Sequence, residues 1–110
     1  SRSESAREEL SAVKRMISIS VKLSYNKLAT SYLTIQSRRE NVRTAVEGLR
    51  IARESYRAGI IRNSELLSAQ LGLTTARTGY INALYSYYVS LAELKRLTCV
   101  EDDSVILEVE

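Results

Sequence analysis

The residues that most often do chemistry in proteins are nearly absent from this 110-residue chain. It has no His, which is the commonest general base and metal ligand, and a single Cys, Cys99. Its only Asp residues, Asp102 and Asp103, lie side by side near the C-terminus. A lone Cys forms no disulfide within its own chain. The inventory excludes zinc clusters and Cys–His or Ser–His–Asp catalysis, so we expect no enzymatic activity, no metal and no cofactor.

The tyrosines are the only aromatic residues, and several of them lie close together in the second half of the chain. A cluster of this kind is compatible with a ligand cage. It is more typical of helix interfaces, where the rings pack and the hydroxyls reach the rim. The clustered residues are Tyr80, Tyr85, Tyr87 and Tyr88.

Basic residues outnumber acidic ones by sixteen to thirteen, and the acids are concentrated at the end. In the middle of the chain, however, acidic and basic residues alternate at steps of three and four. A stripe that binds phosphates would be basic without interleaved acids, so this pattern favours a solvated helix face with intrahelical ion pairs over nucleic-acid recognition. The alternating residues are Glu40, Arg43, Glu47, Arg50, Glu54 and Arg57.

The elements that carry these residues are predicted to be long helices, because the chain has no Pro and only four Gly. From Leu10 to Tyr56 the apolar positions recur at a mean step of about 3.5, the period of a coiled-coil seam. One helix over about 5–58 explains this pattern. Ser5, followed three residues later by Glu8, is a plausible capping box at its start.

A turn and a second helix follow. Gly59 is expected to be the left-handed residue after the first helix, with Asn63 as the N-cap of the second, over about 64–98. Because the connection is short, the helices must pack antiparallel. The predicted fold class is therefore all-α, a long antiparallel coiled-coil hairpin. The tail, 99–110, is acidic and is expected to be disordered or a short strand.

The apolar pattern also predicts a register and further neighbours. If opposed positions sum to about 122, Leu49 faces Leu73, and Gly48 and Gly72 allow close approach of the backbones. Each helix carries a second apolar stripe, which requires a second neighbour from other copies or other segments. These stripes contain Met16, Ile19, Leu23, Leu33, Ala45 and Ile51 in the first helix, and Leu67, Leu71, Ile81, Tyr85, Tyr88 and Ala92 in the second.

The turn at 59–64 is the remaining candidate site. A turn that only connects two helices is usually polar, whereas here Ile60 and Ile61 lie at the apex. Two interpretations are open: the isoleucines dock a partner, or they fold back onto the end of the hairpin.

An ordered set of residues around this turn resembles the C-terminal repeat of TolC-like outer-membrane efflux proteins. The resemblance covers roughly 8–98. It consists of a Tyr-x-x-Gly sequence, an acidic residue and Leu-x-Ala-Gln after the turn, then Leu-x-x-Ala-Arg-x-x-Tyr. The matching residues are Tyr56, Gly59, Glu65, Leu67, Ala69, Gln70, Leu73, Ala76, Arg77, Tyr80, Leu84, Tyr87 and Leu94.

The resemblance implies that 1–98 is a periplasmic hairpin cut from a larger channel protein of the Gram-negative outer membrane, used in multidrug export or type I secretion. Members of the family are trimers whose hairpins form a tunnel wall. They dock a periplasmic adaptor (membrane fusion) protein and thereby work indirectly with an inner-membrane transporter. By position, the docking tip would comprise Gly59, Ile60, Ile61, Arg62 and Asn63, and the entrance region would comprise Tyr56 and Glu65.

Two alternatives stay open from the sequence. A self-associating coiled-coil scaffold would form a closed oligomer without affinity for adaptor hairpins. A basic hairpin that binds nucleic acid or an anionic membrane would show steeply salt-dependent binding. The resemblance favours the channel and implies no nucleic-acid partner.

Overall fold

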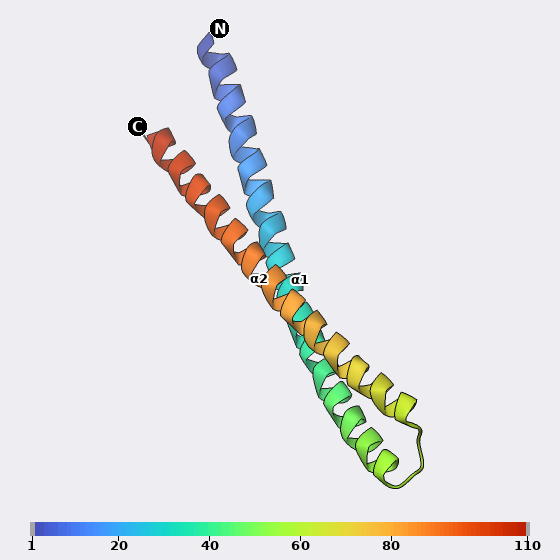
Figure 1. Cartoon of the computed structure of the whole chain (residues 1–110). Helices are drawn as coiled ribbons and strands as arrows, with labels where there is room; N and C mark the ends of the chain where they lie inside the picture. The colour runs from blue at the N-terminus through green and yellow to red at the C-terminus, as the bar shows by residue number, and fades with distance from the viewer. Residues whose placement is uncertain (1, 110) are drawn as a thin grey trace. The chain divides into compact units, whose positions relative to one another are not determined.

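The computed structural model describes the backbone of residues 2–109 and the side chains of residues 2–103. Two helices account for nearly all of it: α1, Arg2–Arg57, and α2, Asn63–Val109. They form an antiparallel helical hairpin joined by one short loop (Figure 1). No strand occurs in the described part of the chain. The all-α hairpin predicted from the sequence is confirmed.

Both helices run past their predicted outer ends. α1 begins at Arg2, so Ser5 and Glu8 lie inside the helix and form no capping box at its start. α2 continues to Val109 in place of the strand or disordered tail expected over 99–110. The physical reason is that no Gly or Pro follows Gly79 to stop the helix. The Thr98 hydroxyl, which donates to the Leu94 carbonyl at 2.8 Å, is accommodated within it.

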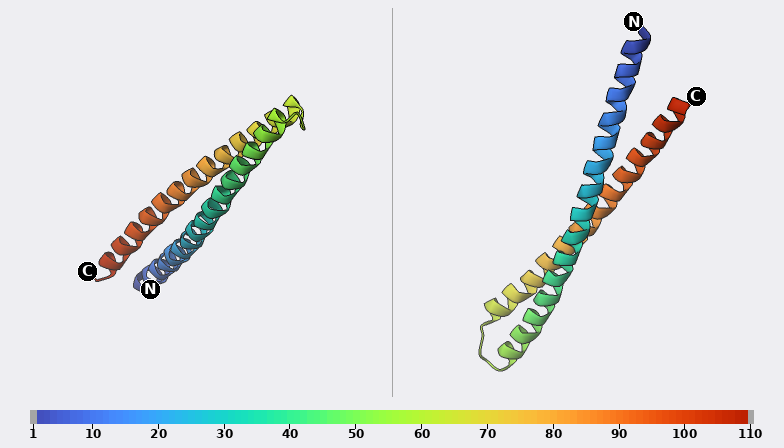
Figure 2. Two further views of the ribbon diagram at one scale, coloured as in Figure 1. Left: turned by 90° about the horizontal axis from the view of Figure 1, so that it is seen from below. Right: turned by 180° about the vertical axis from the view of Figure 1, so that it is seen from behind.

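The chain divides into two compact units. One unit, Ser31–Tyr87, contains the turn and the two helix segments next to it, and Figure 2 shows this turn from two further sides. Its core contains Ile35, Leu49, Leu73 and Ala83, each less than a tenth exposed. Leu49 and Leu73 line the same groove, which confirms the pairing that the register predicted.

The other unit contains the two outer helix ends, Ser1–Thr30 and Tyr88–Glu110. Its buried residues are polar: Ser24 is 8% exposed and Ser90 is 3% exposed. Half-buried Leu28 and Leu94 flank them. No buried polar side-chain atom among the described residues lacks a hydrogen-bond partner, so the buried serines leave no unsatisfied hydroxyl.

The inner face of α2 is a seven-residue repeat in which large and small residues alternate. Every member is buried or half-buried, which confirms the coiled-coil period. Small residues at every second contact leave room for large side chains of the facing helix. The large series is Leu66, Leu73, Tyr80, Tyr87 and Leu94, and the small series is Ala69, Ala76, Ala83 and Ser90.

Aromatic and arginine side chains complete the interface of the Ser31–Tyr87 unit. The rings of Tyr32 and Tyr87 lie with centroids 6.3 Å apart and planes tilted by 55°. The Arg38 stem lies beside Gly79, where an added Cβ would be 3.7 Å from the Arg38 Cδ. Hydrogen bonding with the Tyr80 hydroxyl raises the pKa of Arg39. Arginine stems and tyrosine rings thus add to the aliphatic core of this interface.

Candidate docking surface

The first helix ends in a hydrogen-bonded turn centred on Gly59. The Ile60 N–H donates to the Ser55 carbonyl at 2.8 Å and the Gly59 N–H donates to the Tyr56 carbonyl at 3.0 Å. This pair of bonds is the Schellman motif, and Gly59 has the positive φ of 76° that it requires. The predicted left-handed role of Gly59 is confirmed. The motif fixes the direction in which the chain leaves α1.

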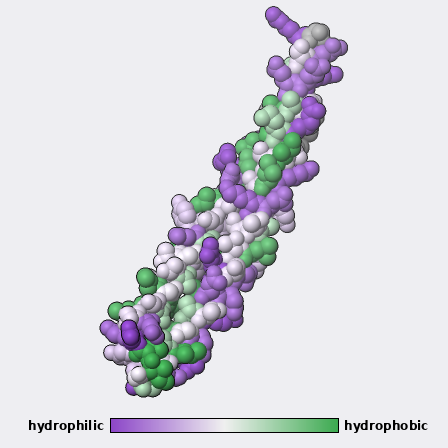
Figure 3. Space-filling view, turned by 90° about the vertical axis from the view of Figure 1, so that its right-hand side faces the viewer, coloured by the Kyte–Doolittle hydropathy of each residue, from purple (hydrophilic) through white to green (hydrophobic). Residues whose placement is uncertain are grey.

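The two isoleucines that follow differ in their surroundings. Ile60 is 76% exposed, whereas Ile61 is half-buried. Apolar side chains gather at the turn end of the face drawn in Figure 3. Each of the two interpretations of the apex therefore fits one residue: Ile60 projects into solvent, and Ile61 folds partly back onto the hairpin.

The start of α2 differs by one residue from the prediction. The Arg62 carbonyl accepts from the Glu65 N–H at 3.0 Å and from the Leu66 N–H at 3.2 Å. By this pattern Arg62 is the N-cap, and Asn63 is the first helical residue. The N-cap prediction for Asn63 is wrong. The cap position is the residue at which the backbone takes up helical geometry, and the capping preference of a side chain does not fix that residue. An Arg side chain has no acceptor for the free N–H groups of the first turn.

The residues predicted for the entrance lie on either side of this turn. Tyr56 is in the last turn of α1 and is 44% exposed, and Glu65 is an exposed residue in the first turn of α2. Glu65 lies where the positive end of the helix dipole favours an acid. Ser68, one turn further along α2, is exposed and carries no charge.

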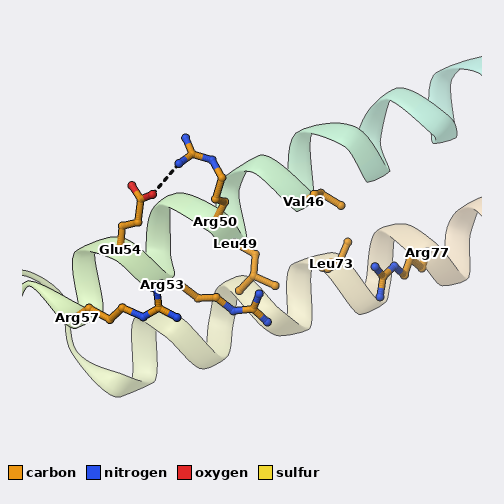
Figure 4. Close-up of a pocket in the computed structure, with 8 residues that line it drawn as sticks. All are labelled: Val46, Leu49, Arg50, Arg53, Glu54, Arg57, Leu73 and Arg77. Carbon is orange, nitrogen blue, oxygen red and sulfur yellow. Dashed lines mark hydrogen bonds and ion pairs between the residues drawn. The ribbon is translucent and has the colours of Figure 1, made fainter.

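One flank of the hairpin above the turn carries a groove of about 510 Å³. Its apolar floor is made by Val46, Leu49 and Leu73, and Leu49 and Leu73 point into the space between the helices (Figure 4). This groove was not among the sites predicted from the sequence. Its charged lining residues are Arg50, Arg53, Glu54, Arg57 and Arg77.

Positive side chains outnumber negative ones in the lining of this groove, and Arg50 is the lining arginine that pairs with acids. The Arg50 guanidinium lies 2.6 Å from the Glu47 carboxylate and 2.8 Å from that of Glu54. Hydrogen bonding from Arg50 lowers the pKa of Glu47, and the same pairing raises the pKa of Arg50. Together with the pair Glu40–Arg43, at 3.3 Å, these contacts confirm the predicted intrahelical pairing for every residue of the alternating series except Arg57.

The remaining arginines of the groove have no such partner. Arg53 and Arg57, one turn apart on α1, extend toward α2, where Arg77 lines the same groove (Figure 4). None of the three makes an ion pair or a side-chain hydrogen bond within the described part of the chain. The signal available in the sequence was the i, i+4 spacing of the first two, combined with the hairpin register.

A second, neutral groove of about 370 Å³ lies beside Leu49. Gly48 and Gly72 line it together, as the register predicted, but neither would bring an added Cβ within 4 Å of a neighbouring atom. The predicted close approach of the two backbones at these glycines is therefore wrong. Its other lining residues are Asn41, Thr44, Ala45, Leu49, Ala69 and Ala76.

The second apolar stripe of α2 stays exposed in the structure, Tyr85 and Tyr88 of the tyrosine cluster included. Two threonines at Thr74 and Thr78 continue the seven-residue spacing of the stripe. Each hydroxyl donates to the carbonyl four residues earlier, at 3.2 Å and 2.9 Å, so neither donor needs an outside partner. The exposed fractions are 54% for Leu67, 66% for Leu71, 62% for Ile81, 72% for Tyr85 and 62% for Tyr88.

Over the described residues, neither helix contains a segment long and apolar enough to cross a membrane. The same residues contain no cluster of three or more His, Cys, Asp or Glu side chains arranged to hold a metal ion.

These features define a class of protein: an antiparallel coiled-coil hairpin with an exposed second apolar face and an apolar tip. The chain belongs to the outer membrane efflux protein family, whose model matches residues 1–99. No match was found among the curated proteins or among the solved structures. The family resemblance drawn from the sequence is thereby confirmed.

Proposed function

We propose that residues 1–98 form part of the periplasmic helical tunnel wall of an outer-membrane export channel, with a tip that docks a periplasmic adaptor protein. The assembled channel would be a trimer and would work indirectly with an inner-membrane transporter that supplies the energy. The segment would contribute a conduit wall and a docking surface, without chemistry of its own. Membership of the efflux family supports this proposal.

The observation that carries the tunnel-wall proposal is the exposed second stripe of α2. A seven-residue apolar repeat fits another helix, and α2 already uses its inner repeat to contact α1. A closed wall of helices gives each helix two neighbours and would cover both repeats. Burial of the stripe would stabilise the assembly by about 25 cal/mol for each Å² of apolar surface removed from water.

The tip proposal is supported by Ile60. At 76% exposure this side chain contributes little to the hairpin, and a docked partner would remove it from water. Tyr56 and Glu65, on the helix ends beside the tip, would then lie near the channel entrance. The family resemblance would place a second acidic residue of the entrance at position 68, where this chain has the neutral Ser68, so we propose no cation-binding ring of acids there.

The experiment replaces both isoleucines by serine, Ile60→Ser with Ile61→Ser, in this chain and in the complete channel. In the chain we expect nearly unchanged helicity and only a small fall in Tm, caused by half-buried Ile61. In the channel, adaptor docking should weaken at least about tenfold, which corresponds to about 1.4 kcal/mol, with a matching loss of efflux.

The matched control changes two exposed valines of α2, Val89→Ser with Val100→Ser, and should leave docking intact. If the isoleucine variant unfolds the hairpin while efflux by the surviving channel is normal, the isoleucines are structural and the tip assignment is wrong. A chain that forms a closed oligomer but never binds an adaptor would instead support the scaffold alternative.

A further inference from the structure

The groove lined by Arg53, Arg57 and Arg77 holds positive charge that this chain does not neutralise. Arg53 and Arg57 are four residues apart on one helix, a spacing at which like charges destabilise the helix. The nearby acids relieve this repulsion only in part, because Glu47 and Glu54, which both pair with Arg50, offset two of the four arginine charges around the groove. The arrangement would be stabilised by an anionic group from outside the chain.

The apolar floor of the groove indicates what kind of anionic group would fit there. Val46, at 46% exposure, lies beside the buried leucines Leu49 and Leu73, so the arginines surround an apolar strip between two helices. A free phosphate would satisfy the arginines but leave this strip in water. A helix that inserts an apolar side chain between the two hairpin helices and carries carboxylates on its flanks satisfies both.

We propose that this groove docks an acidic amphipathic helix of a partner protein, with carboxylates paired to Arg53, Arg57 and Arg77. The arginine fork favours bidentate pairing with carboxylates, which would fix the register of the incoming helix. This inference deepens the adaptor-docking proposal, and it rests on that proposal only for the identity of the partner. The groove lies on the flank of the hairpin, so its occupancy does not require the tip residues.

The test uses the 110-residue chain and a fluorescent helical peptide with Leu at a, Ala at d and Glu at e and g of each heptad. Anisotropy should show saturable binding that weakens as salt is added. The double variant Arg53→Glu with Arg57→Glu should weaken binding at least about tenfold, or about 1.4 kcal/mol. The matched control, Lys95→Glu with Arg96→Glu, removes the same charge from exposed positions of α2 and should change binding less than about twofold.

Four outcomes would overturn the proposal. They are equal weakening by the control, equal binding of a scrambled peptide with the same Glu content, displacement of the peptide by inorganic phosphate at constant ionic strength, and tighter binding of a short DNA duplex. If charge reversal reduces helicity, the peptide-binding test uses Arg53→Gln with Arg57→Gln instead. This variant removes the positive charges without placing new carboxylates beside Glu54.

The proposal for the tip and the proposal for the flank groove can be rejected independently of each other. Ile60→Ser with Ile61→Ser should leave peptide binding unchanged, because neither residue lines the groove. Loss of adaptor docking by the arginine variant alone would support the flank and reject the tip, and the reverse result would reject the flank.

Discussion

Leu49 of α1 and Leu73 of α2 are buried together and form part of the floor of the cationic groove, while Leu49 also borders the neutral groove beside Gly48. This pair therefore holds the two helices together at the level where both flanks of the hairpin are hollowed.

Shortening the Leu49 side chain should destabilise the hairpin. Leu49→Ala is expected to reduce the free energy of unfolding by about 2 to 3 kcal/mol, the lower part of the range for buried leucines, since a two-helix core can partly collapse. Urea denaturation at low protein concentration measures it. Leu71→Ala, at a leucine that is 66% exposed, should change the value by less than about 0.5 kcal/mol, and equal losses would contradict the assigned core.

The exposed stripe of α2 should drive self-association. Contiguous apolar patches above a few hundred Å² usually mark an interface, so sedimentation should detect a dimer or higher oligomer at moderate concentration. Ile81→Lys with Tyr88→Lys should shift the chain to monomer, whereas Thr75→Lys with Ser86→Lys on other faces of α2 should not. A stable wild-type monomer at high concentration would refute the interface.

The helical glycines should be replaceable with a gain in stability. Gly48→Ala and Gly72→Ala meet no atom within 4 Å, so each should add about 1 kcal/mol through helix propensity alone. Gly59→Ala should instead destabilise the hairpin by about 1 kcal/mol, because its φ of 76° is unfavourable for a residue with a Cβ. Thermal denaturation monitored by circular dichroism should distinguish the stabilising from the destabilising substitutions. A loss of stability at Gly48 or Gly72 would reveal an unrecognised close contact.

The N-cap of α2 is open to improvement. Arg62→Ser supplies an oxygen that accepts from the first-turn N–H groups, and it should stabilise the hairpin by about 0.5 to 1 kcal/mol. Ser64→Ala, inside the first turn, serves as the comparison and should have little effect. If both changes are neutral in urea denaturation, Arg62 does not occupy the cap position.

The ion pairs of α1 should produce a small pH dependence. The pKa of Glu47 is lowered by hydrogen bonding from Arg50, so its contribution to stability is present above the ordinary Glu value of about 4.3 and is lost as pH falls through the lower native value. Carboxyl NMR titration should show this pKa rising toward its ordinary value in Arg50→Gln. Arg53→Gln should not shift it, since the hydrogen bonds to Glu47 come from Arg50.

The sequence by itself determined the helices, the turn and the family. The 3.5-residue step of apolar residues, the lack of Pro and the single left-handed Gly59 are local properties of the chain, and they predicted the hairpin and its Leu49–Leu73 contact. The end of α2 was missed because nothing in 99–109 marks either a stop or a continuation, and the start of α1 was misplaced because Ser5 and Glu8 match the capping-box pattern. The N-cap was misplaced at Asn63 because side-chain preference does not fix where the backbone enters a helix.

Only the tertiary structure decided which surfaces exist. Arg53 and Arg57 are neighbours on one helix, but Arg77 joins them only because the second helix returns antiparallel in one register. The same register opens a groove at Gly48 and Gly72, where a sequence pattern suggested close packing. A groove is the space left between two packed helices, and that space depends on side chains brought together from distant parts of the chain.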